Sequence, residues 1–332
     1  MSKNKQAQVF HFDLYGKREE KYEFLKQQSI DSIPWTELEV REPNFFFVNK
    51  NFEGGFEYEQ GFKVDELFRV NSVGIVTSKD AILINDFEDQ LIKNVESHYK
   101  LVYDRELTKK IAYRVFDKKY VYYDIKIIDR ARNVVMKHLL MPNLALITPK
   151  QAILGFQHVF ISNTICDKNY LDSAGQFGAG NVFPLYLYGD KYQQTIGQVN
   201  ERTPNLNPEI VEKISENLRI PFTTEKEQTP STFAPIDILD YIYAVLYNLT
   251  YREKYKEFLK IDFPRVPYPK DPETFWNLVT LGGELRQIHL LESPKVNQFI
   301  TTYPITGNNL VTKPRFESSE SRNPSAHQLA NS

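Results

Sequence analysis

Apolar and polar positions follow two different periods along the first two thirds of the chain. Residues 9–15 alternate with the period of a strand, and Gly16 separates them from a charged helix expected at about 17–28. Further strands are predicted at 73–77, 81–84, 144–148, 159–162 and 182–188, and further helices at 87–101 and 130–140. These elements predict a mixed α/β fold for this part of the chain.

The last third of the chain has the period of helices. Helices are expected at about 208–218, 235–249, 251–259 and 272–291, and three of them begin with a proline, which suits a first helical turn. Residues 190–208 are rich in Gln, Asn, Thr and Pro, so they predict a linker or a long surface loop. Four apolar residues before Pro264 are expected to be largely buried: Phe258, Leu259, Ile261 and Phe263.

Composition narrows the class of protein. The chain has 332 residues, one cysteine and 14% aromatic residues, and it lacks an apolar run of about 18 residues. A lone cysteine, Cys166, cannot form an internal disulfide. We therefore expect a soluble, cytoplasmic protein that does not enter a membrane.

Motifs for catalysis are missing from the sequence. The glycines at 175–180 are not followed by Lys and a hydroxyl residue, so they predict a flexible loop rather than a phosphate-binding loop. The six histidines are scattered singly, without the spacing of metal ligands, and Cys166 is interpreted as a small apolar residue. Two carboxylate pairs are interpreted as solvated or capping positions: Asp124 with Asp129, and Asp237 with Asp240. The sequence supports no ATPase, nuclease or metal site.

Positive charge is concentrated in one segment. Residues 105–151 hold eleven basic and four acidic residues, an excess of +7 in a chain whose net charge is −2. Tyrosines are interleaved with these cations, and the mixture is typical of a surface that contacts nucleic acid. The segment therefore predicts an electropositive face. A basic, solvated helix face with core tyrosines would give the same pattern, and this alternative stays open.

Several runs of sequence resemble a known family. They span residues 113–124, 130–140 and 143–151, and then 241–247 and 251–267. Together they are similar to the C-terminal specificity region of Type ISP restriction-modification enzymes, and the resemblance covers roughly residues 9–292. The family implies adenine-N6 methyltransferases fused to a helicase-like motor and a nuclease, with target recognition at the C-terminal end.

The resemblance implies four parts in the chain. Residues 1–30 are expected to be a remnant of a methyltransferase domain, residues 31–200 an α/β target-recognition domain, residues 201–316 a helical part, and residues 317–332 a disordered tail. The glycine loop for S-adenosylmethionine and the Asn/Asp-Pro-Pro-Tyr loop that holds a flipped adenine are absent from the sequence. No cofactor and no catalytic residue are therefore expected in this chain, although the intact family enzyme uses S-adenosylmethionine.

Double-stranded DNA is the expected partner, together with a methyltransferase domain in cis or in trans. The candidates for phosphate or groove contacts are Arg114, Lys118, Lys119, Arg130, Arg132 and Lys150, with Tyr120, Tyr122 and Gln151 as weaker candidates. The alternative is a protein-docking or scaffold module built on residues 208–291. A protein-docking face is usually depleted of lysine, so the +7 segment favours DNA. A stand-alone enzyme of unassigned chemistry is a third possibility, and whether the chain is an enzyme stays open.

Overall fold

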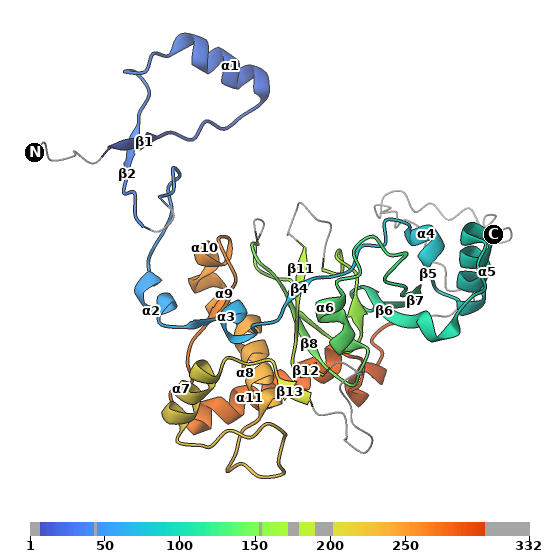
Figure 1. The fold of residues 1–332 in the computed structure, drawn as a ribbon. Helices are drawn as coiled ribbons and strands as arrows, with labels where there is room; N and C mark the ends of the chain where they lie inside the picture. The colour runs from blue at the N-terminus through green and yellow to red at the C-terminus, as the bar shows by residue number, and fades with distance from the viewer. Residues whose placement is uncertain (1–6, 43–44, 153–154, 172–178, 190–201, 303–332) are drawn as a thin grey trace, which may run out of the picture. The chain divides into compact units, whose positions relative to one another are not determined.

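The computed structural model describes residues 7–42, 45–152, 155–171, 179–189 and 202–302, and the mixed α/β fold is confirmed (Figure 1). Contacts divide the chain into one unit of residues 1–293 and a second of residues 294–332, in which a 3-10 helix, η4, spans Pro294–Asn297. The expected tail at 317–332 and most of the expected linker lie outside the described residues. The four expected parts stay a prediction.

The chain opens with a strand, a helix and a second strand. β1 (Val9–His11) pairs antiparallel with β2 (Thr36–Leu38), and α1 (Arg18–Gln27) lies between them in sequence. The predicted strand and helix are confirmed, although the strand is shorter than expected. No residue of α1 is buried, so this segment contributes little to a core.

The first sheet has four strands in the order β10-β6-β7-β5. The central strands, β6 (Thr108–Arg114) and β7 (Asp117–Tyr122), form an antiparallel hairpin after a 3-10 helix, η1 (Arg105–Leu107). The outer strands are β5 (Ile84–Asn85), antiparallel to β7, and β10 (Ile165–Cys166), parallel to β6. Helix α5 (Glu88–Tyr99) buries Leu91 and Val95 in one hydrophobic core with side chains of β6 and β7.

Two predictions in this region are wrong or incomplete. Residues 81–84 were expected to be a strand, but α4 spans Asp80–Leu83, because the amides of Ile82 and Leu83 both donate to the Lys79 carbonyl. An apolar run this short does not by itself distinguish a strand from a helical turn. The expected helix at 130–140 is reduced to α6 (Asn133–Met136) and a 3-10 helix, η2 (Lys137–Leu139).

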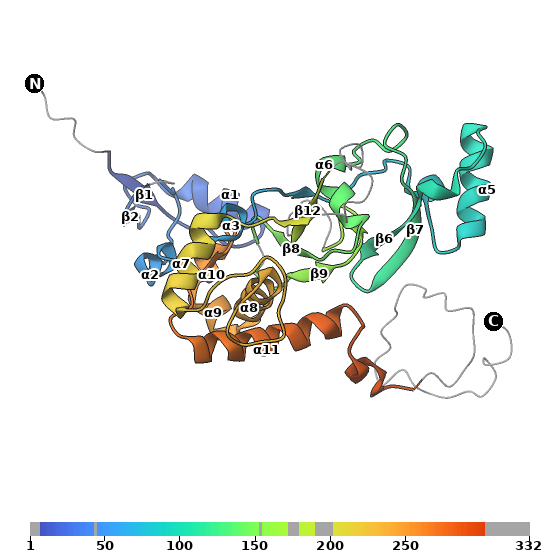
Figure 2. The same cartoon turned by 60° about the horizontal axis from the view of Figure 1, so that its bottom comes forward.

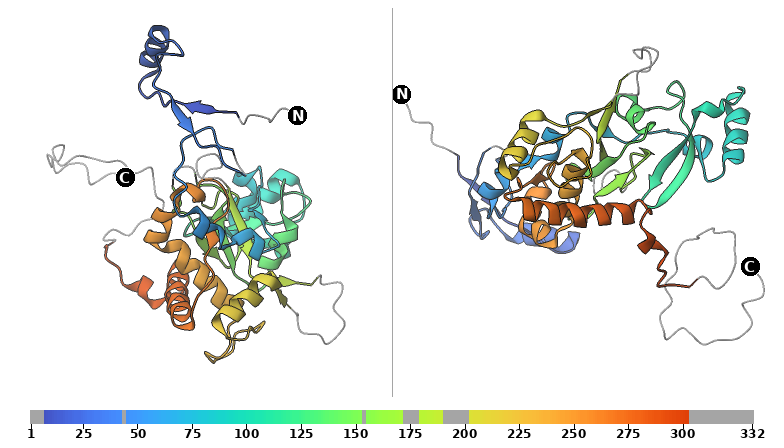
Figure 3. Two further views of the ribbon diagram at one scale, coloured as in Figure 1. Left: turned by 90° about the vertical axis from the view of Figure 1, so that its left-hand side faces the viewer. Right: turned by 90° about the horizontal axis from the view of Figure 1, so that it is seen from below.

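The second sheet lies between the first sheet and the helical part (Figure 3), and its two faces belong to two different hydrophobic cores. Its antiparallel strands, in the order β4-β11-β8-β9, are β4 (Ser72–Val73), β11 (Gly180–Pro184), β8 (Ala145–Pro149) and β9 (Phe160–Ser162). Ile147 pairs with Val182 and faces the core of the first sheet, while Leu146 pairs with Phe183 and faces the helical core. Every residue of β8 is buried, because both of its faces are covered.

The helical part follows the sequence prediction closely. Its helices are α7 (Pro208–Leu218), α8 (Pro235–Tyr247), α9 (Leu249–Lys254), α10 (Lys256–Leu259) and α11 (Pro272–His289). Of the four residues expected to be buried, Leu259 and Phe263 are, whereas Phe258 and Ile261 are half-buried. Within the described ranges we find no helix with the length and apolar character to cross a membrane.

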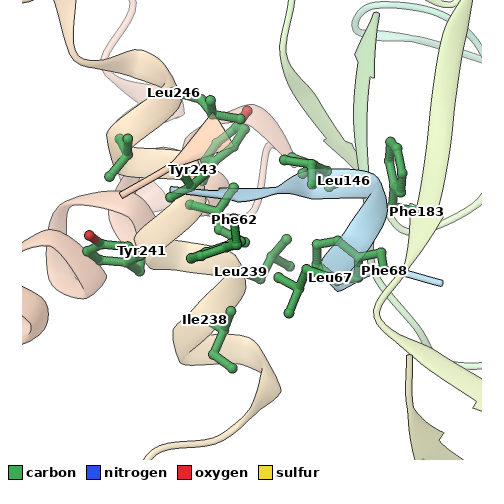
Figure 4. Close-up of a cluster of buried hydrophobic side chains, with 14 of the residues drawn as sticks. Phe62, Leu67, Phe68, Leu146, Phe183, Ile238, Leu239, Tyr241, Tyr243 and Leu246 are labelled. Atoms are coloured by element: carbon green, nitrogen blue, oxygen red, sulfur yellow. The ribbon is translucent and has the colours of Figure 1, made fainter. Parts of the chain in front are cut away.

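Short elements from other parts of the chain complete the helical core. They are α2 (Gly55–Glu59), β3 (Phe62–Lys63), α3 (Val64–Leu67), β12 (Tyr186–Tyr188), β13 (Arg202–Pro204) and β14 (Arg265–Val266). β3 pairs with β14, and β12 pairs with β13. Figure 4 shows Leu239 of α8 converging with Phe68, whose ring centroid is 5.9 Å from that of Phe183 in β11. This cluster joins the helices to the second sheet.

Helices α8 and α11 approach closely at a glycine (Figure 2). A Cβ atom on Gly282 would lie 1.9 Å from the Asp240 carbonyl oxygen, and Arg286 donates to both carboxylate oxygens of Asp240 at 2.7 and 3.0 Å. The interpretation of Asp240 as a solvated or capping position is therefore wrong, because this carboxylate is buried in an ion pair. Asp237 is also buried, but it does cap α8 by accepting from the Ala234 amide.

We predict that Gly282→Ala destabilises the fold by about 2 kcal/mol or more, because the added methyl group must push the two helices apart. Gly189→Ala is the matched control, since a Cβ atom there meets none of the described residues within 4 Å. Urea denaturation followed by circular dichroism measures both variants. Equal midpoints for Gly282→Ala and the wild type would show that the helices do not pack at this distance.

Candidate nucleic-acid interface

The nine residues predicted from the sequence fall in three places. Five lie on the β6–β7 hairpin, two in the loop between β7 and α6, and two directly after β8. In that order they are Arg114, Lys118, Lys119, Tyr120 and Tyr122; Arg130 and Arg132; Lys150 and Gln151. The hairpin therefore holds the largest group.

One face of the hairpin presents lysines without carboxylate partners. The register pairs Lys110 with Tyr120 and Ala112 with Lys118, so these residues share a face. The Lys110 Nζ atom lies 3.2 Å from the centroid of the Tyr120 ring, and Lys118 donates to the Asn163 side chain at 2.9 Å. In the part of the chain that the structure describes, neither lysine forms an ion pair. Both ammonium groups can therefore neutralise an external anion.

The opposite face of the hairpin is largely closed. Ile111 and Val121 are fully buried in the same core as α5. The Lys119 Nζ atom lies 3.2 Å from an oxygen of Asp86 and 3.8 Å from an oxygen of Asp117. Lys119 is thus neutralised inside the molecule, unlike Lys118 beside it in sequence.

Folding brings distant carboxylates to several cations of the basic segment. Four such ion pairs join a residue of 105–151 to a carboxylate outside it: Arg105–Glu88, Arg114–Asp167, Lys119–Asp86 and Lys150–Asp262. They offset more than half of the +7 excess counted from the sequence. The electropositive face stays a prediction, and Lys110 and Lys118 are its strongest members.

Tyr122 is the candidate that the structure removes farthest from solvent. It is 2% exposed, and its ring centroid lies 4.8 Å from that of Tyr103, which packs against the core. Burial raises its pKa and leaves almost no surface for a base or a phosphate. Tyr120, by contrast, is half-buried under Lys110.

Arg130 and Arg132 lie in the loop between β7 and α6, and backbone hydrogen bonds join this loop to the segment between β4 and α4. The backbone of Arg130 exchanges two hydrogen bonds with Val76, while its side chain is exposed and 3.6 Å from an oxygen of Asp129. Arg132 has a φ of 51° and precedes the first turn of α6. Its Nε atom is buried and has no hydrogen-bond partner among the described residues.

Lys150 and Gln151 line an open pocket of about 630 Å³ near the helical part. The Gln151 amide donates to the Ile261 carbonyl at 2.9 Å, and Lys150 lies 3.7 Å from Asp262. Burial alone would raise the pKa of Asp262, but hydrogen bonding and charge from Lys63, 2.9 Å away, lower it below its usual value. These two candidates thus belong to a mixed-charge surface, separate from the hairpin residues.

Asp167 is a site residue that the sequence analysis missed. β10 runs parallel to β6 with Cys166 opposite Ala112, so Asp167 comes beside the end of β6. There one of its oxygens lies 2.8 Å from Nη1 of Arg114, a residue 53 positions away in sequence. Burial raises the pKa of Asp167, although the Asn169 amide and the Arg114 charge oppose that shift. No local sequence signal could have revealed this pair.

Cys166, next to it, is fully buried. Burial raises the pKa of its thiol to about 12, which keeps the thiol protonated near neutral pH. Its interpretation as a small apolar residue agrees with this position.

Comparison with protein families decides the identity of the fold. The family model of the Type ISP C-terminal specificity domain matches residues 87–328, well over half of the chain. The chain belongs to this family. The resemblance seen in the sequence is thereby confirmed, while no curated protein matches the chain.

Solved structures of longer chains contain a similar fold. The DrdV–DNA complex aligns with a TM-score of 0.63 and 19% identity over 82% of this chain and 29% of that one. The ATP-dependent Type ISP restriction-modification enzyme LlaBIII bound to DNA aligns with a TM-score of 0.56 and 19% identity, over 77% of this chain and 18% of that one. A nuclease-deletion mutant of the Type ISP enzyme LlaGI in complex with a DNA substrate mimic aligns with a TM-score of 0.60 and 20% identity, over 85% of this chain and 24% of that one. The chain spans less than a third of the length of each.

We predict that Arg114→Gln makes the stability of the specificity domain fall more steeply as the pH rises from about 4 to about 7. A raised pKa means that folded Asp167 holds its proton where the unfolded chain has released it, so its contribution is present at low pH and lost as the pH rises. Removing the Arg114 charge raises this pKa further.

Urea denaturation across this pH range measures the difference between variant and wild type. Arg105→Gln is the control, because its partner Glu88 is more exposed than Asp167. A difference for Arg114→Gln that does not change with pH would contradict the ion pair.

Proposed function

We propose that this specificity domain recognises double-stranded DNA as the target-recognition module of a restriction-modification enzyme, and that it performs no catalysis itself. The observation that carries the proposal is the position of Lys110 and Lys118, which are exposed, share one face of the hairpin and have no carboxylate partners among the described residues. Lysines that neutralise phosphates supply most of the sequence-independent affinity for DNA. The titles of the three similar structures describe those proteins in complexes with DNA or a DNA mimic.

The geometry of the hairpin supports duplex DNA as the ligand. A two-stranded β-ribbon fits the major groove, which is wide enough to admit one. At its turn, residues 113–119, the hairpin is two-stranded, because β5 pairs with residues 120–121 and β10 with residues 111–112. Here the ribbon is held by β5 and β10 on its two edges and by α5 in its core, so its side chains start from a rigid backbone. A protein-docking face would usually hold fewer lysines.

We expect the double variant Lys110→Ala/Lys118→Ala to weaken binding to duplexes of any sequence, with a loss that shrinks as salt rises. Each phosphate contact contributes about 0.9 to the slope of log affinity against log salt, so the slope should fall by up to about 2. Fluorescence anisotropy over a salt series measures it.

The matched control is Lys254→Ala/Lys256→Ala, which removes the same charge at the ends of α9 and α10, where the lysines pair with Glu57 and Glu253. An unchanged slope in the hairpin variant would place the phosphate contacts elsewhere. A wild type that binds no duplex at low salt would overturn DNA recognition.

We further propose a methyltransferase domain as a partner, in cis or in trans. The described residues before α2 expose many apolar side chains, of which Tyr15 is 82% exposed, Ile30 78% and Phe47 68%. Exposed apolar groups in such number are typical of a surface that another protein covers. A docking surface at these residues is compatible with DNA recognition, and it is not the docking alternative built on residues 208–291. A cytoplasmic location belongs to the same proposal.

The isolated chain is expected to bind no S-adenosylmethionine, because its sequence has neither the glycine loop nor the adenine-holding loop of an adenine methyltransferase. Isothermal calorimetry with the cofactor tests this assignment. A dissociation constant in the micromolar range would instead support an enzyme that carries its own cofactor site.

A further inference from the structure

Arg114 is restrained on two sides while part of its guanidinium stays open. Its Nη1 atom donates to Asp167 and to the backbone carbonyl of Tyr113, and its Cζ atom lies 4.0 Å from the centroid of the Tyr113 ring. Hydrogen bonds from Nε and Nη2 to other described residues are absent, and the side chain is 39% exposed. The Nε and Nη2 atoms are adjacent donors in a guanidinium plane that is held in place, and they are therefore available to a ligand.

The groups that restrain Arg114 are themselves fixed. The Tyr113 hydroxyl donates to the Asp80 carboxylate at 3.0 Å, and the Asp167 carboxylate accepts from the backbone N–H of Asn169 at 2.9 Å. The backbone of Asp167 packs against Gly74, where a Cβ atom would lie 2.5 Å from the Asp167 carbonyl oxygen. A second layer of contacts thus sets the plane of the guanidinium.

Such restraint suits base reading better than phosphate binding. Guanine presents two acceptors, O6 and N7, side by side in the major groove, and the planar fork of arginine matches them. A phosphate contact depends mainly on charge and tolerates a flexible cation. Arg114 also follows an irregularity in the β6–β7 register between Ala112 and Arg114, and β-bulges of this kind often re-aim a side chain toward a site.

We propose that Arg114 reads a guanine in the major groove and that Asp167 is its positioning residue. This inference rests on the DNA recognition proposed above and gives it a first base-reading contact. Lys110 and Lys118, on the same hairpin, supply phosphate contacts beside it. The competing explanation is that Arg114 serves only to neutralise the buried carboxylate of Asp167.

Selection from a pool of duplexes with randomised sequence, followed by sequencing, distinguishes these explanations. The full chain is used as the wild type, as Arg114→Lys and as Asp167→Asn. The readout is the base preference at each position of the enriched motif, a ratio between bound sequences that does not depend on the fraction of folded protein. Arg105→Lys is the matched control, because Arg105 forms an ion pair with Glu88 outside the hairpin.

The expected wild-type motif contains a guanine whose preference falls about tenfold or more in Arg114→Lys. Asp167→Asn weakens the preference at that same position and at no other, because the guanidinium is present but no longer held. Arg105→Lys leaves the motif unchanged. A structural role alone predicts an unchanged motif in all three variants.

Two results would overturn the proposal. In the first, Arg114→Lys keeps the wild-type preference at every position. In the second, Arg114→Lys and Asp167→Asn change the base preference at different positions of the DNA motif. A wild type that binds duplex but enriches no motif would contradict the proposed function itself, and the positioning role of Asp167 would fall with it.

Discussion

Burial of both faces of the β8–β11 pair is the constraint on which the rest of the structure depends. Ile147 and Val182 face the core of the first sheet, and Leu146 and Phe183 face the helical core, so the two cores share one pair of strands. A slip of one residue in this register would move each set to the wrong side. The pair therefore fixes the first sheet and the helices in one structure.

The first sheet positions the residues of the candidate site. Its hairpin lies between β5 and β10, and the parallel pairing of β10 with β6 carries Asp167 to Arg114. Internal ion pairs neutralise Lys119 and Lys150, whereas Lys110 and Lys118 have no carboxylate partner among the described residues. The fold thus determines which cations of the basic segment can meet an external anion.

The sequence predicted the helical part best, because Pro208, Pro235 and Pro272 start helices that bury a continuous apolar face. It did not predict the β6–β7 hairpin, since the turn holds Phe116 at a φ of 62° where Gly or Asn would have given the usual signal. The sequence gives the excess of basic residues correctly, but it does not show which of these cations are paired inside the molecule. The carboxylate partners Glu88, Asp86, Asp167 and Asp262 lie outside the segment, and only the tertiary fold brings them to it.

The central claim is that the part of the β6–β7 hairpin that exposes Lys110 and Lys118 is the surface that meets DNA. Chemical acetylation of lysines, with and without duplex, followed by mass spectrometry of the peptides, tests it most directly. Our account predicts that duplex protects Lys110 and Lys118, while Lys254 and Lys256 on the helical part react equally in both states. Protection of Lys254 and Lys256 with Lys110 and Lys118 unaffected would contradict it.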